Sequence, residues 1–184
     1  MYANQKKYWE GYKKELINPI DLLVLNGHYN AATKLILLGI DSLAGFYTGR
    51  ISSGSVGNSF IKFVKKYMPK FNDITFPSSG SGVLKNRKKG HPITTPTEIL
   101  YYIFRNDMIH DGSLGIGVEV YKDKDYKILW SGEGVQIFRI NIIGFFKYFK
   151  KAINDYENDL ISDENLKKKF SDKYHDIENP CFEI

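Results

Sequence analysis

Apolar and aromatic residues recur every three or four positions between residues 142 and 160. The stripe consists of Phe145, Phe149, Ile153, Tyr156 and Leu160. Residues with this spacing lie along one side of an α-helix. Asn141, which directly precedes the segment, is of a type that caps helix N-termini. A helix with such a face needs other elements to cover it, so the sequence predicts a helical domain.

Similar patterns predict further helices along the chain. They cover residues 5–16, 20–25, 29–47, 59–68, 96–111 and 163–174. We place a break at Pro19, because the residue before a proline avoids helical dihedral angles. The helix over 29–47 is expected to end at a Gly49 cap. It is expected to pack through Ala31, Leu35, Leu38, Ser42 and Gly45.

Three short segments after residue 112 have the composition of β-strands, and turn-forming residues separate them. They cover residues 117–122, 126–131 and 135–140, and they predict a β-meander or hairpin. A chain of 184 residues fits one domain. We therefore predict a mainly α fold class with a single domain over 1–184. The strands, at about 115–140, are inserted before the last long helix, and a polar helix and tail follow at 163–184.

Charge and composition narrow the classes of partner. Lys and Arg number 26 against 21 Asp and Glu, and the net charge of +5 is compatible with nucleic acid without establishing it. The single cysteine, Cys181, cannot form an internal disulfide, and no Cys/His spacing indicates a zinc site. The first residues lack the apolar core of a signal peptide. The most apolar stretch, Ala31–Tyr47, contains Lys34 and Asp41 and is short for a bilayer span. We expect a cytoplasmic protein without membrane segment, metal or cofactor.

A strong helix start stands at residues 95–98. Thr95 predicts an N-cap, Pro96 occupies the first helical position, and Glu98 completes a capping box. The last turns of this helix contain the segment RNDMIH, residues 105–110. Four different polar groups therefore lie within about two helical turns.

This segment combines side chains that suit phosphoryl transfer. Arg105 offers a fixed fork of donors for a phosphate and for charge developing on phosphorus. His110 can take or give a proton near neutral pH. Asn106 can orient the phosphate or the imidazole, and Asp107 is a further supporting candidate. Together they predict cleavage of RNA without a metal ion.

RNDMIH resembles the signature of the HEPN superfamily, in which a histidine follows an arginine after four to six residues and a polar residue comes directly after the arginine. The order of the predicted helices over about residues 5 to 160 is similar in outline. The resemblance implies that the fold is an antiparallel helical bundle, which forms a homodimer with the motif helices facing each other. It also implies a metal-independent endoribonuclease that leaves a 2′,3′-cyclic phosphate, in a toxin–antitoxin or antiviral setting with an antitoxin as a possible partner. Arg105 and His110 would be the catalytic pair, with Asn106 in support.

The spacing of the pair raises a geometric problem. On an ideal α-helix five residues turn by about 500°, which leaves Arg105 and His110 about 140° apart. A curled arginine, a distorted helix end or a site shared by two protomers would each bring the groups together. Asn106 and His110, four positions apart, share a face of an ideal helix.

Other interpretations remain open for the same residues. His110 fits a histidine that interacts with the helix dipole, and Arg105 fits a salt bridge to Asp41, Asp107 or Asp111. In the long segment over 70–94 a basic run is a weaker candidate for RNA contact, and such runs are more often solvated loops. The run comprises Lys85, Arg87, Lys88 and Lys89. The alternatives to a ribonuclease are a non-catalytic HEPN-like module that binds RNA, a nucleotide or a protein, and a helical scaffold.

Overall fold

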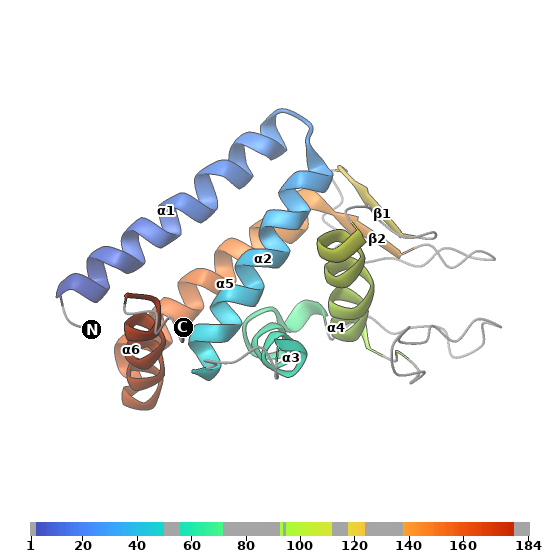
Figure 1. Ribbon diagram of the computed structural model, residues 1–184. Helices are drawn as coiled ribbons and strands as arrows, with labels where there is room; N and C mark the ends of the chain where they lie inside the picture. Colours follow the sequence, from blue (N-terminus) through green and yellow to red (C-terminus); the bar gives the residue numbers. More distant parts are fainter. Residues whose placement is uncertain are drawn as a thin grey trace, which may run out of the picture.

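The computed structural model describes residues 3–49, 56–71, 93, 95–111, 118–123 and 138–178, and it is mainly helical, as predicted (Figure 1). The α-helices are α1 (Ala3–Leu25), α2 (Tyr29–Thr48), α3 (Val56–Tyr67), α4 (Pro96–Ile99), α5 (Ile142–Ser162) and α6 (Glu164–Glu178). A short 3₁₀-helix, η2 (Pro69–Phe71), follows α3. The helix that begins with α4 continues to Asp111 as η3 and η4, described below.

Helix α2 lies at the centre of the fold and packs against α1, α3, α5 and α6. Its core face differs from the predicted one. Ile36, Ile40 and Leu43 are fully buried, whereas Leu38 is 44% exposed and Ser42 is exposed. The helix is apolar around most of its circumference, so its sequence does not single out the buried side.

Helix α1 is continuous, and the break predicted at Pro19 is wrong. A proline inside a helix removes one backbone hydrogen bond and crowds the preceding turn. Trp9 and Ile20, on either side of Pro19, are fully buried, and Val24 is 8% exposed. Their packing holds both halves of α1 against the core and outweighs the local cost of the proline.

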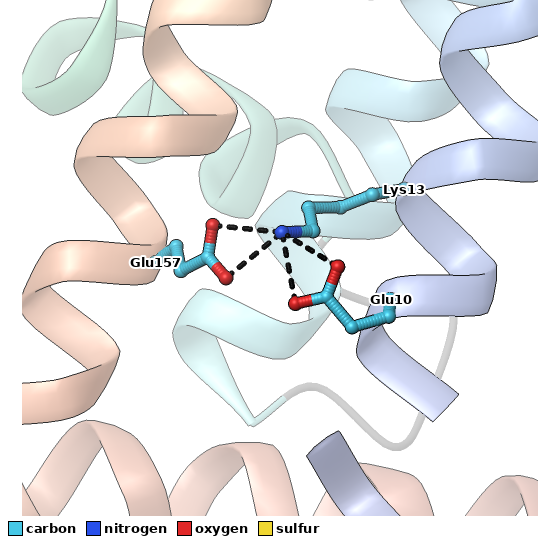
Figure 2. Close-up of polar contacts among 3 residues, drawn as sticks. All are labelled: Glu10, Lys13 and Glu157. Atoms are coloured by element: carbon cyan, nitrogen blue, oxygen red, sulfur yellow. Dashed lines mark hydrogen bonds and ion pairs between the residues drawn. The ribbon is translucent and has the colours of Figure 1, made fainter. Parts of the chain in front are cut away.

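An ion-pair cluster joins α1 to α5. The Nζ atom of Lys13 lies 2.9 Å from both carboxylate oxygens of Glu157 and 3.2 Å from Glu10, as Figure 2 shows. The Lys13 side chain is 18% exposed. A charge this far from water needs opposite charges beside it, which the two carboxylates provide.

A second polar cluster joins α3 to α5. The Nζ atom of Lys66 lies 2.7 Å from Oδ2 of Asp159, and the Tyr67 hydroxyl donates a hydrogen bond to the same oxygen at 2.9 Å. The hydrogen bond from Lys66 lowers the pKa of the Asp159 carboxyl. The apolar side of α3 faces the core, because Phe60, Phe63 and Val64 are fully buried.

The two described strands, β1 (Val118–Tyr121) and β2 (Phe138–Asn141), form a parallel pair in which Val118 lies opposite Phe138. The prediction of a hairpin or meander is therefore wrong for these strands, since neighbours in either arrangement are antiparallel. Alternation identifies a strand but not its partner. The connection over residues 122–137 is long enough for the crossover that a parallel pair requires. The strand predicted at 126–131 lies outside the described residues.

Strand β2 leads directly into α5 through the predicted cap. Asn141 is buried, and its Oδ1 accepts a hydrogen bond from the Ile143 N–H at 3.0 Å. Its Nδ2 donates to the carbonyl of Asp123 at 2.9 Å. One side chain thus caps the helix and holds the segment that follows β1. The predicted stripe of α5 is also confirmed, because all five of its members are fully buried.

Candidate functional site

The helix with the RNDMIH segment begins as the sequence predicts. The Glu98 N–H donates a hydrogen bond to Oγ1 of Thr95 at 3.2 Å, and the Thr95 N–H donates to Oε2 of Glu98 at 3.0 Å. These reciprocal bonds form a capping box, with Pro96 at the helix start. The start of the motif helix is therefore fixed by local interactions.

Beyond Ile99 the helix is not an α-helix. The segments η3 (Leu100–Arg105) and η4 (Asp107–Asp111) are π-helical, and the Asn106 N–H donates to the carbonyl of Tyr101, five residues earlier. A π-helix forms its backbone hydrogen bonds between residues five apart, so its turns are wider than those of an α-helix, and such segments frequently occur at functional sites. The 140° separation calculated for an ideal α-helix does not apply here.

The π-helical winding brings Arg105 and His110 together. Nη1 of Arg105 lies 3.2 Å from Nε2 of His110. A guanidinium can only donate hydrogen bonds, so a hydrogen bond at this contact requires Nε2 of the imidazole as the acceptor. His110 is exposed, whereas the Arg105 side chain is 13% exposed. The pair therefore presents an imidazole to solvent and holds a guanidinium directly behind it.

Three further groups fix the guanidinium. Nη2 of Arg105 donates to Oδ2 of Asp41 in α2 at 3.0 Å, and the Asp41 side chain is 15% exposed. Nη1 also donates to Oδ1 of Asn106 at 3.2 Å. The ring of Tyr101 lies 5.6 Å from the Arg105 Cζ, within range of a cation–π interaction. Asn106, predicted as a supporting residue, thus contacts Arg105 directly. The salt bridge between Arg105 and Asp41, one of those considered from the sequence, is present.

Asp107, a further predicted residue, does not join this site. Asp107 is 6% exposed, so its carboxylate is buried and is not available to a substrate. Lys85, Arg87, Lys88 and Lys89 lie outside the described residues. Among the residues that are described, no three His, Cys, Asp or Glu side chains gather in a way that could hold a metal ion.

Tyr101 was missed by reasoning from the sequence. A signal for it exists, since Tyr101 stands four positions before Arg105, the spacing at which helical side chains meet. Gly57 of α3 lies close to this ring, and a Cβ built on it would stand 2.8 Å from Cε1 of Tyr101. The ring is therefore held between α3 and the guanidinium.

Comparisons with known proteins give no guide to this site, because no family model, curated protein or solved structure matches the chain. None of the helices within the described ranges has the length and apolar character needed to cross a membrane.

Proposed function

We propose that this protein is a metal-independent endoribonuclease of the HEPN type, which cuts single-stranded RNA in the cytoplasm. The observation that carries the proposal is the contact at 3.2 Å between Arg105 and an exposed His110. It pairs a proton acceptor with a group that stabilises negative charge, as hydrolysis of RNA without metal requires.

In the proposed reaction His110 acts as general base. Its Nε2 lone pair takes the proton of a ribose 2′-hydroxyl, and the 2′ oxygen attacks the adjacent phosphorus. The Arg105 guanidinium shifts its Nη1 hydrogen bond from the imidazole to a phosphate oxygen and stabilises the developing charge. The bond from phosphorus to the 5′ oxygen breaks and leaves a 2′,3′-cyclic phosphate. The leaving oxygen takes a proton from a protonated imidazole, which in the homodimer belongs to the second protomer.

Asp41 and Asn106 act on Arg105 rather than on the substrate. Asp41 holds Nη2 in a nearly buried ion pair, which leaves Nη1 aimed at the imidazole. A preorganised guanidinium needs little rearrangement when the phosphate arrives. The proposed biological setting is a toxin–antitoxin or antiviral system, with an antitoxin as a further partner.

The test is cleavage of a labelled single-stranded RNA in EDTA. Arg105→Ala and His110→Ala are expected to lose at least about 100-fold in rate. His28→Ala and Arg139→Ala serve as matched controls, because His28 is exposed and Arg139 forms a surface ion pair with Glu119. Both controls should cleave normally and leave cyclic phosphate ends. Equal cleavage by all four variants would contradict the proposal.

The second candidate is a non-catalytic HEPN-like module that binds RNA, a nucleotide or a protein. This candidate is favoured because both Nη atoms of Arg105 already have partners, namely Asp41, Asn106 and His110. An arginine with a purely structural role in an ion pair has the same kind of contacts. In that case the wild-type protein binds RNA without cutting it, and His110→Ala changes no product.

A further inference from the structure

A groove of about 590 Å³ lies between the N-terminal half of α1 and α6. It is lined by one stripe of α1, with Tyr174 of α6 opposite. The stripe includes Lys7, Tyr8, Gly11, Tyr12 and Glu15. In Figure 1 the N-terminal end of α1 and helix α6 lie on the left, whereas α4, which continues into η3 with Arg105, lies on the right. The groove is therefore separate from the candidate active site.

Aromatic rings form the walls of the groove. The ring centroid of Tyr8 lies 5.1 Å from that of Tyr174 and 6.3 Å from that of Tyr12. Tyr174 is 4% exposed, whereas Tyr8 is only partly buried and keeps part of its ring open to the groove. A Cβ built on Gly11 would meet no atom within 4 Å, so the space beside Tyr8 is open. A flat ring can therefore enter and stack on tyrosine, which is how proteins hold unpaired bases.

Opposite charges stand along the same stripe. Lys7 and Glu15 are both exposed, and eight helical residues separate them by about 12 Å along the axis. No ion pair formed among the described residues engages either side chain. Lys7 offers donors to a phosphate, and the ionised Glu15 offers two oxygens that can only accept hydrogen bonds. This order, cation then aromatic wall then carboxylate, matches the order of groups along a nucleotide.

We propose that this groove binds a guanine nucleotide, with the base stacked on Tyr8, the phosphate near Lys7 and the base edge on Glu15. Guanine has two adjacent N–H donors on its Watson–Crick edge, which match the two oxygens of a carboxylate. Adenine, cytosine and uracil present no two adjacent donors there, so Glu15 selects against them. The ligand is a free guanine nucleotide or an unpaired guanosine of an RNA. The site goes beyond the proposed ribonuclease activity and does not depend on it.

Calorimetric titration of the full chain with GMP, AMP, CMP and UMP tests the proposal. GMP is expected to bind at least about tenfold more tightly than the other three. Glu15→Gln replaces one acceptor by a donor and should reduce GMP binding to the level of the others. Lys7→Gln should weaken GMP binding about tenfold and leave guanosine binding unchanged, because guanosine has no phosphate.

Matched controls and a second ligand complete the experiment. Lys14→Gln and Asp172→Asn alter exposed charges outside the groove lining and should bind GMP as the wild type does. An oligouridine with one guanosine, titrated beside GMP, separates the two sources of the base, since tighter binding of the oligomer identifies RNA as the ligand. Equal affinity for all four nucleotides, no binding of any of them, or GMP binding that survives Glu15→Gln would overturn the proposal. Glu15 and Lys7 are exposed, so loss of the fold does not explain their effects.

Discussion

Asp41 and Arg105, 64 positions apart in the chain, join α2 to the π-helical segment through a hydrogen bond of 3.0 Å. Both side chains are more than four-fifths buried, at 15% and 13% exposure. Removal of either partner leaves a charge with little access to water. The pair is therefore the structural link between the central helix and the candidate catalytic arginine.

Asp41→Asn is expected to lower the cleavage rate about tenfold or more while leaving KM nearly unchanged, because Arg105 loses its orientation but keeps its charge. The free energy of unfolding should fall by about 1–3 kcal/mol. Urea denaturation and RNA cleavage measure the two effects. In a double-mutant cycle with Arg105→Gln, a coupling energy below about 0.5 kcal/mol would contradict the role of the pair. Asp41→Glu, which keeps the carboxylate, should recover part of the activity.

Exchange of two neighbouring residues tests the position of the imidazole. The double variant Ile109→His/His110→Ile moves the imidazole to the fourth position after Arg105 and keeps the composition. In the structure Nη1 of Arg105 contacts the imidazole at position 110, and the exchange removes that contact, so this variant should lose at least about 100-fold in activity. Full activity of the exchanged variant would contradict the assignment of position 110 as the site of the catalytic imidazole.

Thr95→Ala is expected to destabilise the protein by about 1 kcal/mol, because it removes one of the two reciprocal bonds at the start of the motif helix. Thr95→Ser keeps the hydroxyl and should stay within a few tenths of a kcal/mol of the wild type. Chemical denaturation of the three proteins gives the comparison. If Ala and Ser prove equally stable, the capping box contributes nothing to the fold.

Asp159 makes stability depend on pH at the acid end. Its pKa is lower in the folded protein than its ordinary value, chiefly through the hydrogen bond from Lys66. The resulting stabilisation is present above the unfolded-state pKa of about 4 and is lost as pH falls through the lower folded-state value. Asp159→Asn should therefore lose stability at pH 7 and show a flatter decline below about pH 4. Asp172→Asn, at an exposed position of α6, is the matched control for unfolding measured from pH 7 to pH 2.

The helix starts could be predicted because caps act over a few residues. Thr95 and Asn141 were identified by type and position alone, and both make the expected bonds. The continuity of α1 could not be predicted in this way. The cost of Pro19 is local and visible in the sequence, whereas the burial of Trp9 and Ile20 that offsets it depends on distant elements. The buried side of α2 was missed for a related reason, since its nearly uniform apolar surface gives periodicity little to distinguish.

The candidate site also has features that could be predicted from the sequence and features that could not. The chemistry of Arg105 and His110 follows from their residue types, which the sequence displays. Their contact follows from the winding of the helix between them, which no single residue indicates. The partnership with Asp41 was one of three salt bridges that the sequence left open, and only the packing of α2 against η3 distinguishes it.

The π-helix also bears on how many residues must separate two groups that work together. A turn of π-helix holds more residues than a turn of α-helix, so the chain can accommodate an inserted residue without moving the side chains on either side of it. Arg105 and His110, with four residues between them, meet as a pair with three intervening residues would meet on an α-helix. The additional intervening residue is compensated by the larger number of residues in each turn of the π-helix. Proteins that share this arrangement of guanidinium and imidazole can therefore differ in the number of residues between the arginine and the histidine.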